Sequence, residues 1–353
     1  MQRSGYEPHE IYAGKRILLV GNPESVHVGT HLHQAAETAG LRVMFSDVRR
    51  AFAGPAWRVK FNWWMRGHRP PRLRPFSQEV VQACREFHPL WLLATGLAPL
   101  DASALQAIGQ LGVQRLNYLT DDPLNSAHRS PWFLKALPHY DHVFSPRRAN
   151  MEDLRRLGCP AVSYMPFAYA PELHFPEPSV TTAEQAQFAA EVVFVGGADC
   201  DRVPYMAALI RAGFKVALYG GYWERYPETK AHARGHADPQ TLRKAIRGAK
   251  VALCLVRRAN RDGHAMRTFE VPAVGACMLV EDTEEHRELF GEEGKSVVYF
   301  RDVDDMIEKL RWLLAHDDER QRLAQTVHHL ITKGKHTYRD RLMTVLDLTG
   351  REV

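Results

Sequence analysis

The sequence predicts an α/β protein with two Rossmann-like domains that face each other across a cleft, and with a C-terminal helix that closes the chain. Three observations predict this fold class. Short apolar runs alternate with segments of helical periodicity, which is typical of parallel sheets covered by helices. A proline-rich stretch interrupts the alternation once, after which it begins again. The length of 353 residues also exceeds the roughly 250–300 residues at which single hydrophobic cores stop growing.

The first half of the chain predicts an N-terminal domain over residues 1–170, which we expect to bind an acceptor. Its apolar runs predict strands at 16–21, 41–45, 90–94, 115–119 and 142–145. Residues 171–188 predict a linker, because their prolines and the polar run at 181–187 continue neither a helix nor a strand.

The second half predicts a further α/β domain over residues 189–335. Its apolar runs predict strands at 192–196, 215–219, 251–255, 276–280 and 297–300, with helices at 239–248 and 302–315 among them. Residues 336–353 predict the closing helix, because Leu342, Val345 and Leu346 recur at helical spacing. Ligands of open parallel sheets bind at the carboxyl ends of the strands, which places the expected site but does not name its chemistry.

Composition excludes several classes of protein. No apolar run approaches the roughly 18 residues that span a bilayer, and five scattered cysteines without CxxC spacing fit free thiols in a reducing compartment. We therefore expect a soluble, cytoplasmic protein. The net charge of +5 is too small to predict a nucleic-acid partner.

Common enzyme motifs are absent from the chain. The segment 21–29 after the first predicted strand is not GxGxxG, which argues against a dehydrogenase, and no P-loop, GxSxG or HExxH motif occurs. His27, His31 and His33 lack a nearby carboxylate or cysteine that would complete a zinc site. We therefore interpret them as the start of the first helix.

Two DxD pairs, 199–201 and 302–304, match the spacing of a carboxylate metal site. Such pairs arise easily by chance, and arginines can neutralise a diphosphate without Mg²⁺. We predict no metal site and no resident cofactor.

Candidate anion-binding residues cluster in the second half. The strand at 193–195 runs into Gly196 and Gly197, with Arg202 beyond, a pattern suited to bringing backbone amides and a guanidinium to a phosphate. A second strand is followed by a basic loop that contains Arg257 and leads to a short helix at Arg267. Each arginine taken singly is also compatible with a solvated surface residue.

Two acids, Asp262 and Glu270, lie eight residues apart, one in this loop and one on the helix. A carboxylate accepts two hydroxyl hydrogen bonds at once, so such a pair can hold the ribose and the sugar ring of an extended nucleotide-sugar. The alternative is that Glu270 only caps or solvates a helix.

These residues resemble the CgeB-like, spore-maturation type of glycosyltransferase of the B-fold, similar to glycosyltransferase group 1. The resemblance covers roughly 160 residues and is looser in the first half, at 118–123 and 140–144. The matching segments are 194–197, 255–257 with Asn260, 267–270 with 275–276, 297–300 with Asp302, and 336–338 with Arg341.

The resemblance implies that Glu270 binds the ribose of the donor and that Asp262 takes the place of the preceding acid of the two-glutamate motif. This sequence has Asp where retaining relatives have Glu, so the anomeric outcome stays open. Arg202 and Arg267, with Arg257 as a third candidate, would face the diphosphate.

Four residues of the first half are candidates for acceptor-side chemistry. Asp121 and Asp122 follow a predicted strand, where one of them would serve as the catalytic base, but an Asp-rich turn before proline explains them equally well. His27 and His31 follow the first strand, and one of them would contact the acceptor or the donor sugar.

The segment 49–74 interleaves tryptophans and a phenylalanine with eight basic residues. This composition suits an anionic or sugar-containing acceptor, or peripheral contact with an anionic membrane. It is also typical of a half-buried helix with one solvated face.

Together these features predict a metal-independent glycosyltransferase that moves a sugar from a nucleotide-diphospho-sugar, with UDP-sugar as the first guess, to a carbohydrate, protein or small-molecule acceptor. The alternative functions with the same fold are a nucleotide-sugar hydrolase or epimerase, and a non-catalytic spore or surface-assembly module.

Overall fold

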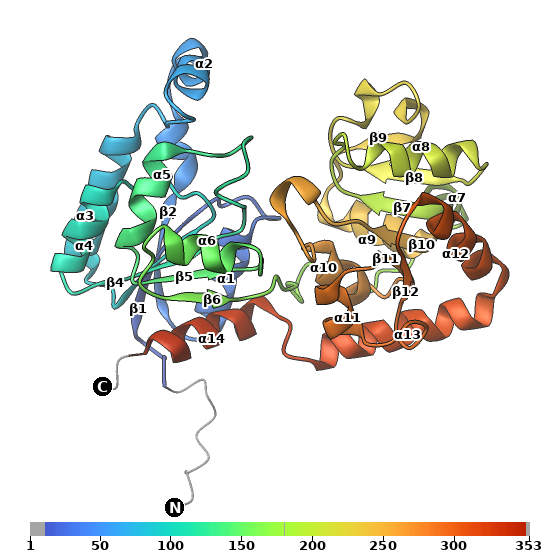
Figure 1. The fold of residues 1–353 in the computed structure, drawn as a ribbon. Helices are drawn as coiled ribbons and strands as arrows, with labels where there is room; N and C mark the ends of the chain where they lie inside the picture. The colour runs from blue at the N-terminus through green and yellow to red at the C-terminus, as the bar shows by residue number, and fades with distance from the viewer. Residues whose placement is uncertain (1–10, 180, 351–353) are drawn as a thin grey trace, which may run out of the picture. The chain divides into compact units, whose positions relative to one another are not determined.

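The computed structural model describes residues 11–179 and 181–350. The first ten residues of the expected N-terminal domain and the last three of the expected closing helix lie outside these ranges. The chain forms two compact units, each a parallel sheet covered by helices (Figure 1). The first contains residues up to Pro166 with 259–261 and 338 onward, and the second contains 167–258 and 262–337.

The first unit is built on a six-stranded parallel sheet in the order β2-β1-β3-β4-β5-β6. Its strands are β1 (Arg16–Gly21), β2 (Arg42–Asp47), β3 (Trp91–Thr95), β4 (Gln114–Tyr118), β5 (His142–Ser145) and β6 (Val162–Tyr164). The sequence predicted all of them except β6, a three-residue edge strand whose side chains are only partly buried. These three residues contain no apolar run and are too few to establish an alternation from which a strand could be predicted.

Helices cover both faces of this sheet. They are α1 (Val28–Thr38), α2 (Ala56–Met65), α3 (Leu73–Phe87), α4 (Ala102–Gln110), α5 (Pro131–Ala136), α6 (Asn150–Arg156) and α14 (Tyr338–Thr349), with short 3-10 turns η1 (Val48–Phe52) and η2 (Leu137–His139). The core beneath them contains Leu18, Leu92, Leu105 and Tyr140, all buried.

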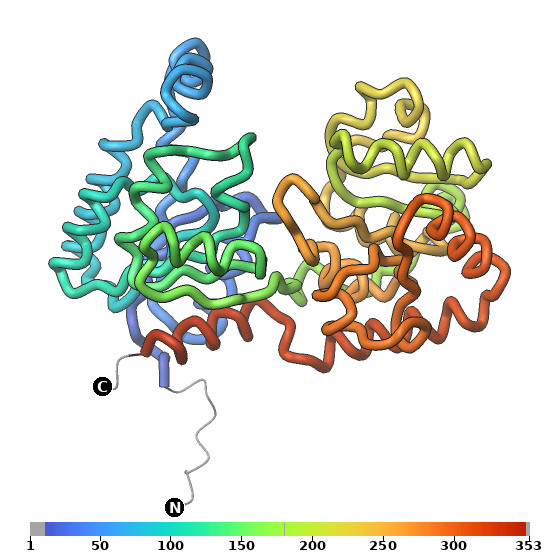
Figure 2. The backbone as a smooth tube through the Cα atoms, viewed as in Figure 1, coloured from blue at the N-terminus to red at the C-terminus, as the bar shows by residue number. Residues whose placement is uncertain are grey.

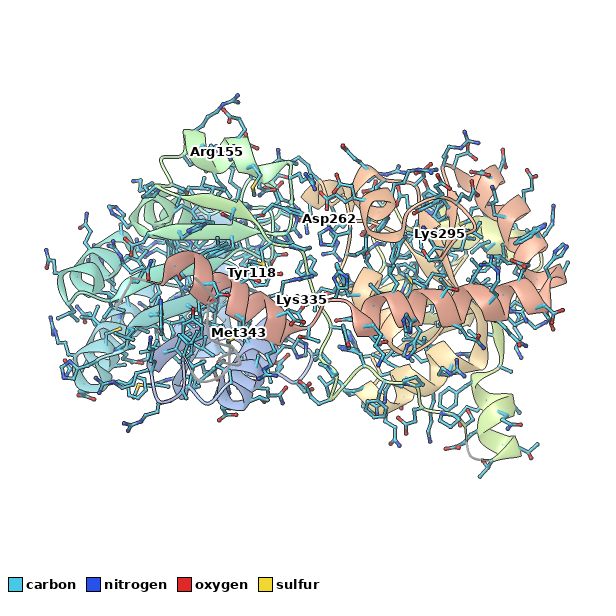
Figure 3. All side chains as sticks on the ribbon, turned by 90° about the horizontal axis from the view of Figure 1, so that it is seen from below. Tyr118, Arg155, Asp262, Lys295, Lys335 and Met343 are labelled. Carbon is cyan, nitrogen blue, oxygen red and sulfur yellow. The ribbon has the colours of Figure 1, made fainter. Side chains whose placement is uncertain are left out.

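The closing helix α14 belongs to the first unit, although it follows the second unit in sequence. Figure 2 shows the red C-terminal segment returning along this unit. The Tyr338 ring of α14 stacks on His31 of α1 at 4.9 Å between centroids. The Tyr118 hydroxyl and the Arg341 guanidinium both donate to the Pro166 carbonyl, at 3.0 and 2.9 Å, and Figure 3 labels Tyr118 and, on α14, Met343.

The second unit has a six-stranded parallel sheet in the order β12-β11-β10-β7-β8-β9. Its strands are β7 (Ala190–Val195), β8 (Val216–Tyr219), β9 (Ala233–Gly235), β10 (Ala249–Cys254), β11 (Met278–Glu281) and β12 (Val298–Phe300). Read from β9, this is the 3-2-1-4-5-6 order of a doubly wound nucleotide-binding fold. The sequence missed only β9, which is three residues long.

The helices of the second unit are α7 (Thr182–Phe188), α8 (Val203–Arg211), α9 (Pro239–Gly248), α10 (Arg267–Ala273), α11 (Glu284–Phe290), α12 (Val303–Ala315) and α13 (Asp317–Lys333), with 3-10 turns η3 (Trp223–Arg225), η4 (Lys230–His232) and η5 (Arg258–Asn260). Helix α7 lies inside the segment expected to be an irregular linker. It forms because Thr181 and Glu184 make a reciprocal capping box at its start.

No helix in the described ranges is long and apolar enough to cross a membrane.

A close backbone approach fixes the turn after β7. Gly220, which follows β8, has a φ of +128°, and a Cβ atom there would overlap the carbonyl group of Gly196. The Gly196 amide donates to the Tyr219 carbonyl at 2.8 Å, and the Trp223 indole donates to the Gly196 carbonyl at 2.8 Å. The two turns therefore fit together only with glycine at 220.

We predict that Gly220→Ala lowers the free energy of unfolding by at least about 2 kcal/mol, because it adds backbone overlap to an unfavourable φ. The matched control is Gly213→Ala, where φ is +87° but no atom lies within 4 Å of the new Cβ. It should cost only about 1 kcal/mol. Urea denaturation of both variants checks this, and equal losses would contradict the close-approach account.

Candidate functional site

The second sheet has a topological switch point between β7 and β10. From β7 the chain proceeds to β8 on one side, whereas β10 lies on the other side and leads to β11. The connections beyond the carboxyl ends of these two strands diverge, and ligands of doubly wound sheets bind in the crevice that this leaves. All the donor-side residues predicted from the sequence lie in the segments that follow β7 and β10.

The turn after β7 carries Gly196 and Gly197 and leads into α8. The Asp199 carboxylate accepts hydrogen bonds from the amides of Asp201 and Arg202, at 3.1 and 2.9 Å. Asp199 thus occupies backbone donors at the start of α8 that the sequence pattern suggested for a phosphate. The anion-binding capacity of this turn therefore depends on its guanidinium groups.

Arg202 is a buried cation with few partners for its charge. It is 7% exposed, its Nη1 donates to the Gly197 carbonyl at 3.3 Å, and its guanidinium lies 5.5 Å from the centre of the Phe194 ring. Burial lowers the pKa of Arg202, and the neighbouring charge of Arg257 lowers it further. A buried guanidinium beside a second one is stabilised by any anion that enters between them.

Arg257 follows β10 and has a half-exposed side chain. Its Nε lies 3.8 Å from Asp199 Oδ2, and Arg202 Nε lies 3.7 Å from the same oxygen. Two cations therefore share one carboxylate, and both guanidinium groups lie beyond hydrogen-bond distance of it. The solvent exposure of Arg257 leaves its guanidinium accessible to a ligand.

Glu270 is buried in the first turn of α10, at 2% exposure. It forms an ion pair with Arg267 one turn earlier, and its other carboxylate oxygen lies 3.7 Å from His174 Nε2. Arg267 Nε also donates to the Val195 carbonyl at the end of β7, at 3.3 Å. The alternative of a solvated helix residue is therefore wrong for Glu270.

Asp262 lies in the loop between β10 and α10, where Figure 3 labels it. Its amide donates to the Arg257 carbonyl at 3.2 Å, and its charge acts electrostatically on Arg202. Asp262 thus lies in the loop and Glu270 on the helix, as the sequence predicted.

A buried network that the sequence did not reveal holds this loop. His264 Nε2 accepts from the Phe167 amide at 3.1 Å, and its Nδ1 pairs with the Glu285 carboxylate. Because the Phe167 amide is a donor, the proton of neutral His264 resides on Nδ1. The Thr283 hydroxyl donates to the Gly263 carbonyl at 2.6 Å. The partners come from three separate parts of the chain, so no local pattern signals them.

His286 holds the start of α10 through Thr268. Its Nδ1 lies 2.7 Å from the Glu281 carbonyl, and its Nε2 lies 2.9 Å from the Thr268 hydroxyl. Complete burial lowers the pKa of His286 to about 4. The imidazole is therefore neutral at pH 7, donating through Nδ1 and accepting from Thr268.

We predict that His286 makes the second unit less stable in acid. Below its unfolded pKa of about 6.5 the unfolded chain binds a proton that the folded chain refuses, so the free energy of unfolding falls by about 3 kcal/mol as the pH drops to about 4. His286→Gln should lower stability at pH 7 but flatten its dependence on pH. Urea titrations between pH 7 and 5 check this, and equal slopes for both proteins would contradict it.

The acceptor-side candidates lie in the first unit and differ in how exposed their side chains are. His27 is about half exposed, and its Nε2 lies 3.2 Å from Glu24 Oε2. It is the N-cap residue of α1, but its side chain makes no capping hydrogen bond. His31 is buried against Tyr338. Within the described ranges no group of three or more histidine, cysteine or acidic side chains is arranged to hold a metal ion.

Asp121 and Asp122 have different environments. Asp122 is buried and accepts from the Leu124 amide at 2.9 Å, Asn150 at 3.2 Å and Arg261 at 2.7 Å. It thus serves the turn, as the alternative of an Asp-rich turn predicted, and also an ion pair that the sequence did not predict. Asp121 is partly exposed and receives a long 3.4 Å hydrogen bond from Thr120, so it is the more available carboxylate.

The first acid of each DxD pair accepts a hydrogen bond from a nearby backbone amide. Asp302 caps α12 by accepting from the Asp305 amide at 2.9 Å, and Asp199 accepts from the Arg202 amide at 2.9 Å in the turn before α8. A groove of about 1090 Å³ lies between α3 and α4 and is lined by polar and small residues. None of the predicted site residues lines it, so we attach no chemistry to it.

Comparisons with known proteins find a family model that matches part of the chain. Residues 203–347 match the model of a family described as glycosyl transferase-like. No curated protein sequence matches the chain.

Solved structures match the whole chain at low identity. Sucrose-phosphate synthase from Thermosynechococcus elongatus has a TM-score of 0.67 at 12% identity, covering 95% of this chain and 98% of its own. Anabaena Alr3699/HepE in complex with UDP-glucose has a TM-score of 0.62 at 13% identity, covering 95% and 98%. A protein from Listeria monocytogenes assigned as UDP-N-acetylglucosamine 2-epimerase has a TM-score of 0.55 at 12% identity, covering 91% and 95%.

The chain therefore has the fold of the B-type glycosyltransferases, with two Rossmann-like domains, and its second unit is similar over most of its length to the glycosyl transferase-like family.

Proposed function

We propose that the chain is a glycosyltransferase whose second unit binds a nucleotide-diphospho-sugar, with a UDP-sugar as the first candidate. The observation that carries the proposal is Glu270, a buried carboxylate in an ion pair with Arg267 on the helix that follows β10. Arg202 and Arg257, which follow β7 and β10, share Asp199 at the switch point of the same sheet. The similarity of residues 203–347 to the glycosyl transferase-like family supports it.

Glu270 fits the recognition of a ribose. A carboxylate accepts hydrogen bonds from both hydroxyls of a diol. In this proposal, two charge-assisted hydrogen bonds from the ribose replace part of the contact between Glu270 and Arg267. Arg267 holds Glu270 from the preceding turn and joins it to the end of β7. The carboxylate is thus positioned before any ligand arrives.

The arginines fit the diphosphate. When the bond between the anomeric carbon and the phosphate oxygen breaks, its electron pair stays on the nucleoside diphosphate, so negative charge grows on the leaving group. Fixed cations at that point stabilise the transition state more than the ground state. Arg202 Nε and Arg257 Nε lie 3.7 and 3.8 Å from Asp199 Oδ2, beyond hydrogen-bond distance, so both keep donors for this role. We propose that they act without a metal ion.

Acceptor activation belongs to the first unit in this proposal. The acceptor hydroxyl forms the new bond to the anomeric carbon and loses its proton to a base. Asp121 is the preferred base, because Asp122 is occupied by Arg261 and backbone amides. We further propose the CgeB-like subtype and a carbohydrate, protein or small-molecule acceptor.

An epimerase or hydrolase is the second candidate, because the fold also matches the protein assigned as UDP-N-acetylglucosamine 2-epimerase. Product analysis separates the two. A glycosyltransferase forms a glycoside only when an acceptor is present, whereas an epimer or free sugar formed in every condition would favour the second candidate.

We predict that Glu270→Gln weakens UDP-glucose binding by roughly a hundredfold, because it removes the charge that strengthens hydrogen bonds to the ribose. Calorimetric titration measures the dissociation constant. Glu284→Gln, an exposed acid at the start of α11, is the matched control. Unchanged binding in a folded Glu270→Gln protein would refute the assignment of this residue.

We predict that Arg257→Ala weakens binding of UDP by roughly tenfold or more and leaves binding of uridine unchanged, because the guanidinium contacts phosphate only. Arg257 is half-exposed, so the variant should fold normally. Arg211→Ala, an exposed cation of the same unit, is the control. Equal losses for UDP and uridine would contradict a phosphate contact.

A further inference from the structure

Helix α2 exposes an aromatic face that the core of the first unit does not use. In Figure 1 the helix stands out from the remainder of this unit. Of its ten residues only Asn62 is buried, whereas Trp57 is 70% and Trp64 80% exposed. The sequence alternative of a half-buried helix is therefore wrong, and the usual cause of aromatic residues in a helix, burial in a core, does not apply.

The exposed apolar side chains form one continuous face. Trp57, Phe61, Trp64 and Met65 follow the spacing i, i+4, i+7 and i+8, which places them on one side of an α-helix. All four are exposed. The cations Arg58 and Lys60 flank this face on its two sides by the same helical geometry. We call these six residues the α2 face.

The helix is held firmly where it leaves the unit. The Trp63 ring packs on His68 at 4.3 Å between centroids, and the Trp132 indole donates to the His68 carbonyl at 3.4 Å. A Cβ atom at Gly67 would lie 2.7 Å from the Pro131 ring. These contacts use the opposite side of α2 and its C-terminal turn, so they orient the α2 face outward.

The surrounding segment is strongly basic. Residues 49–74 contain eight arginines and lysines and no acid, although the whole chain carries only +5. The remainder of the chain is therefore net acidic, at −3. Arg49 pairs with Asp47, and Arg50 and Arg72 pair with Glu79. Arg58, Lys60 and Arg66 are exposed, and no acidic partner is found for them among the described residues.

We propose that the α2 face docks on an anionic phospholipid bilayer, with the helix lying in the plane of the membrane interface. Tryptophan and phenylalanine favour the boundary between head groups and acyl chains, and cations beside them attract anionic head groups. A helix of ten residues is about 15 Å long and cannot span the bilayer, but it can lie along it. The proposal does not depend on the activity proposed for the second unit.

The test is flotation of the full chain with vesicles. The chain should float with vesicles of phosphatidylglycerol and phosphatidylcholine in equal parts, should not float with phosphatidylcholine alone, and should be released by high salt. The double variant Trp57→Ala/Trp64→Ala should lose binding with its charge unchanged. Arg58→Gln/Lys60→Gln should weaken binding roughly tenfold or more.

Matched controls alter the same residue types elsewhere. Trp312→Ala removes an exposed tryptophan of α12, and Arg211→Gln/Arg311→Gln removes two exposed cations of the second unit. Both should bind vesicles as the parent does. The α2 variants should keep the parent's thermal midpoint, because the side chains contact no core.

Three outcomes would overturn the proposal. The first is no flotation of the parent chain with anionic vesicles. The second is tighter binding to a single-stranded oligonucleotide than to the vesicles, which would assign the face to nucleic acid. The third is a dimer that Trp57→Ala/Trp64→Ala converts to a monomer without vesicle binding, which would assign the face to self-association.

Discussion

The ion pair between Arg267 and Glu270 is the interaction on which the candidate site depends. A carboxylate at 2% exposure is tolerated only with a close cation, because an unpaired buried charge is costly. Arg267 supplies that cation and also bonds the carbonyl at the end of β7. The pair therefore joins α10 to the central strand of the second sheet. Arg202, in the turn after β7, is also buried, and burial lowers its pKa.

The second sheet explains why these groups meet. Its strand order brings the ends of β7 and β10 side by side, although more than fifty residues separate them in sequence. Turn glycines then allow the backbone after β7 and β8 to approach closely. The buried His264 and His286, with the partly buried Glu285, hold the loop and helix that carry Asp262 and Glu270. The site is thus supported by parts of the chain that do not themselves face a ligand.

Sequence reasoning predicted the fold well because most strands contain apolar residues between turn signals. It failed at β6 and β9, which have three residues and no buried apolar run, unlike the equally short β12, and at α7, where the Thr181–Glu184 capping box overrides a polar composition. It predicted that Glu270 and the arginines belong to one site, because they follow strands of the same predicted sheet. It did not find the His264–Glu285 pair or the occupation of Asp122 by Arg261, which joins residues 139 positions apart.

The most direct test of the account is a crystal structure of the chain with UDP bound. The account predicts the ribose hydroxyls within hydrogen-bond distance of Glu270, with the diphosphate on the guanidinium groups of Arg202, Arg257 and Arg267. Its central claim would be contradicted by a nucleotide bound away from the carboxyl ends of β7 and β10, or by one at that place whose ribose does not contact Glu270.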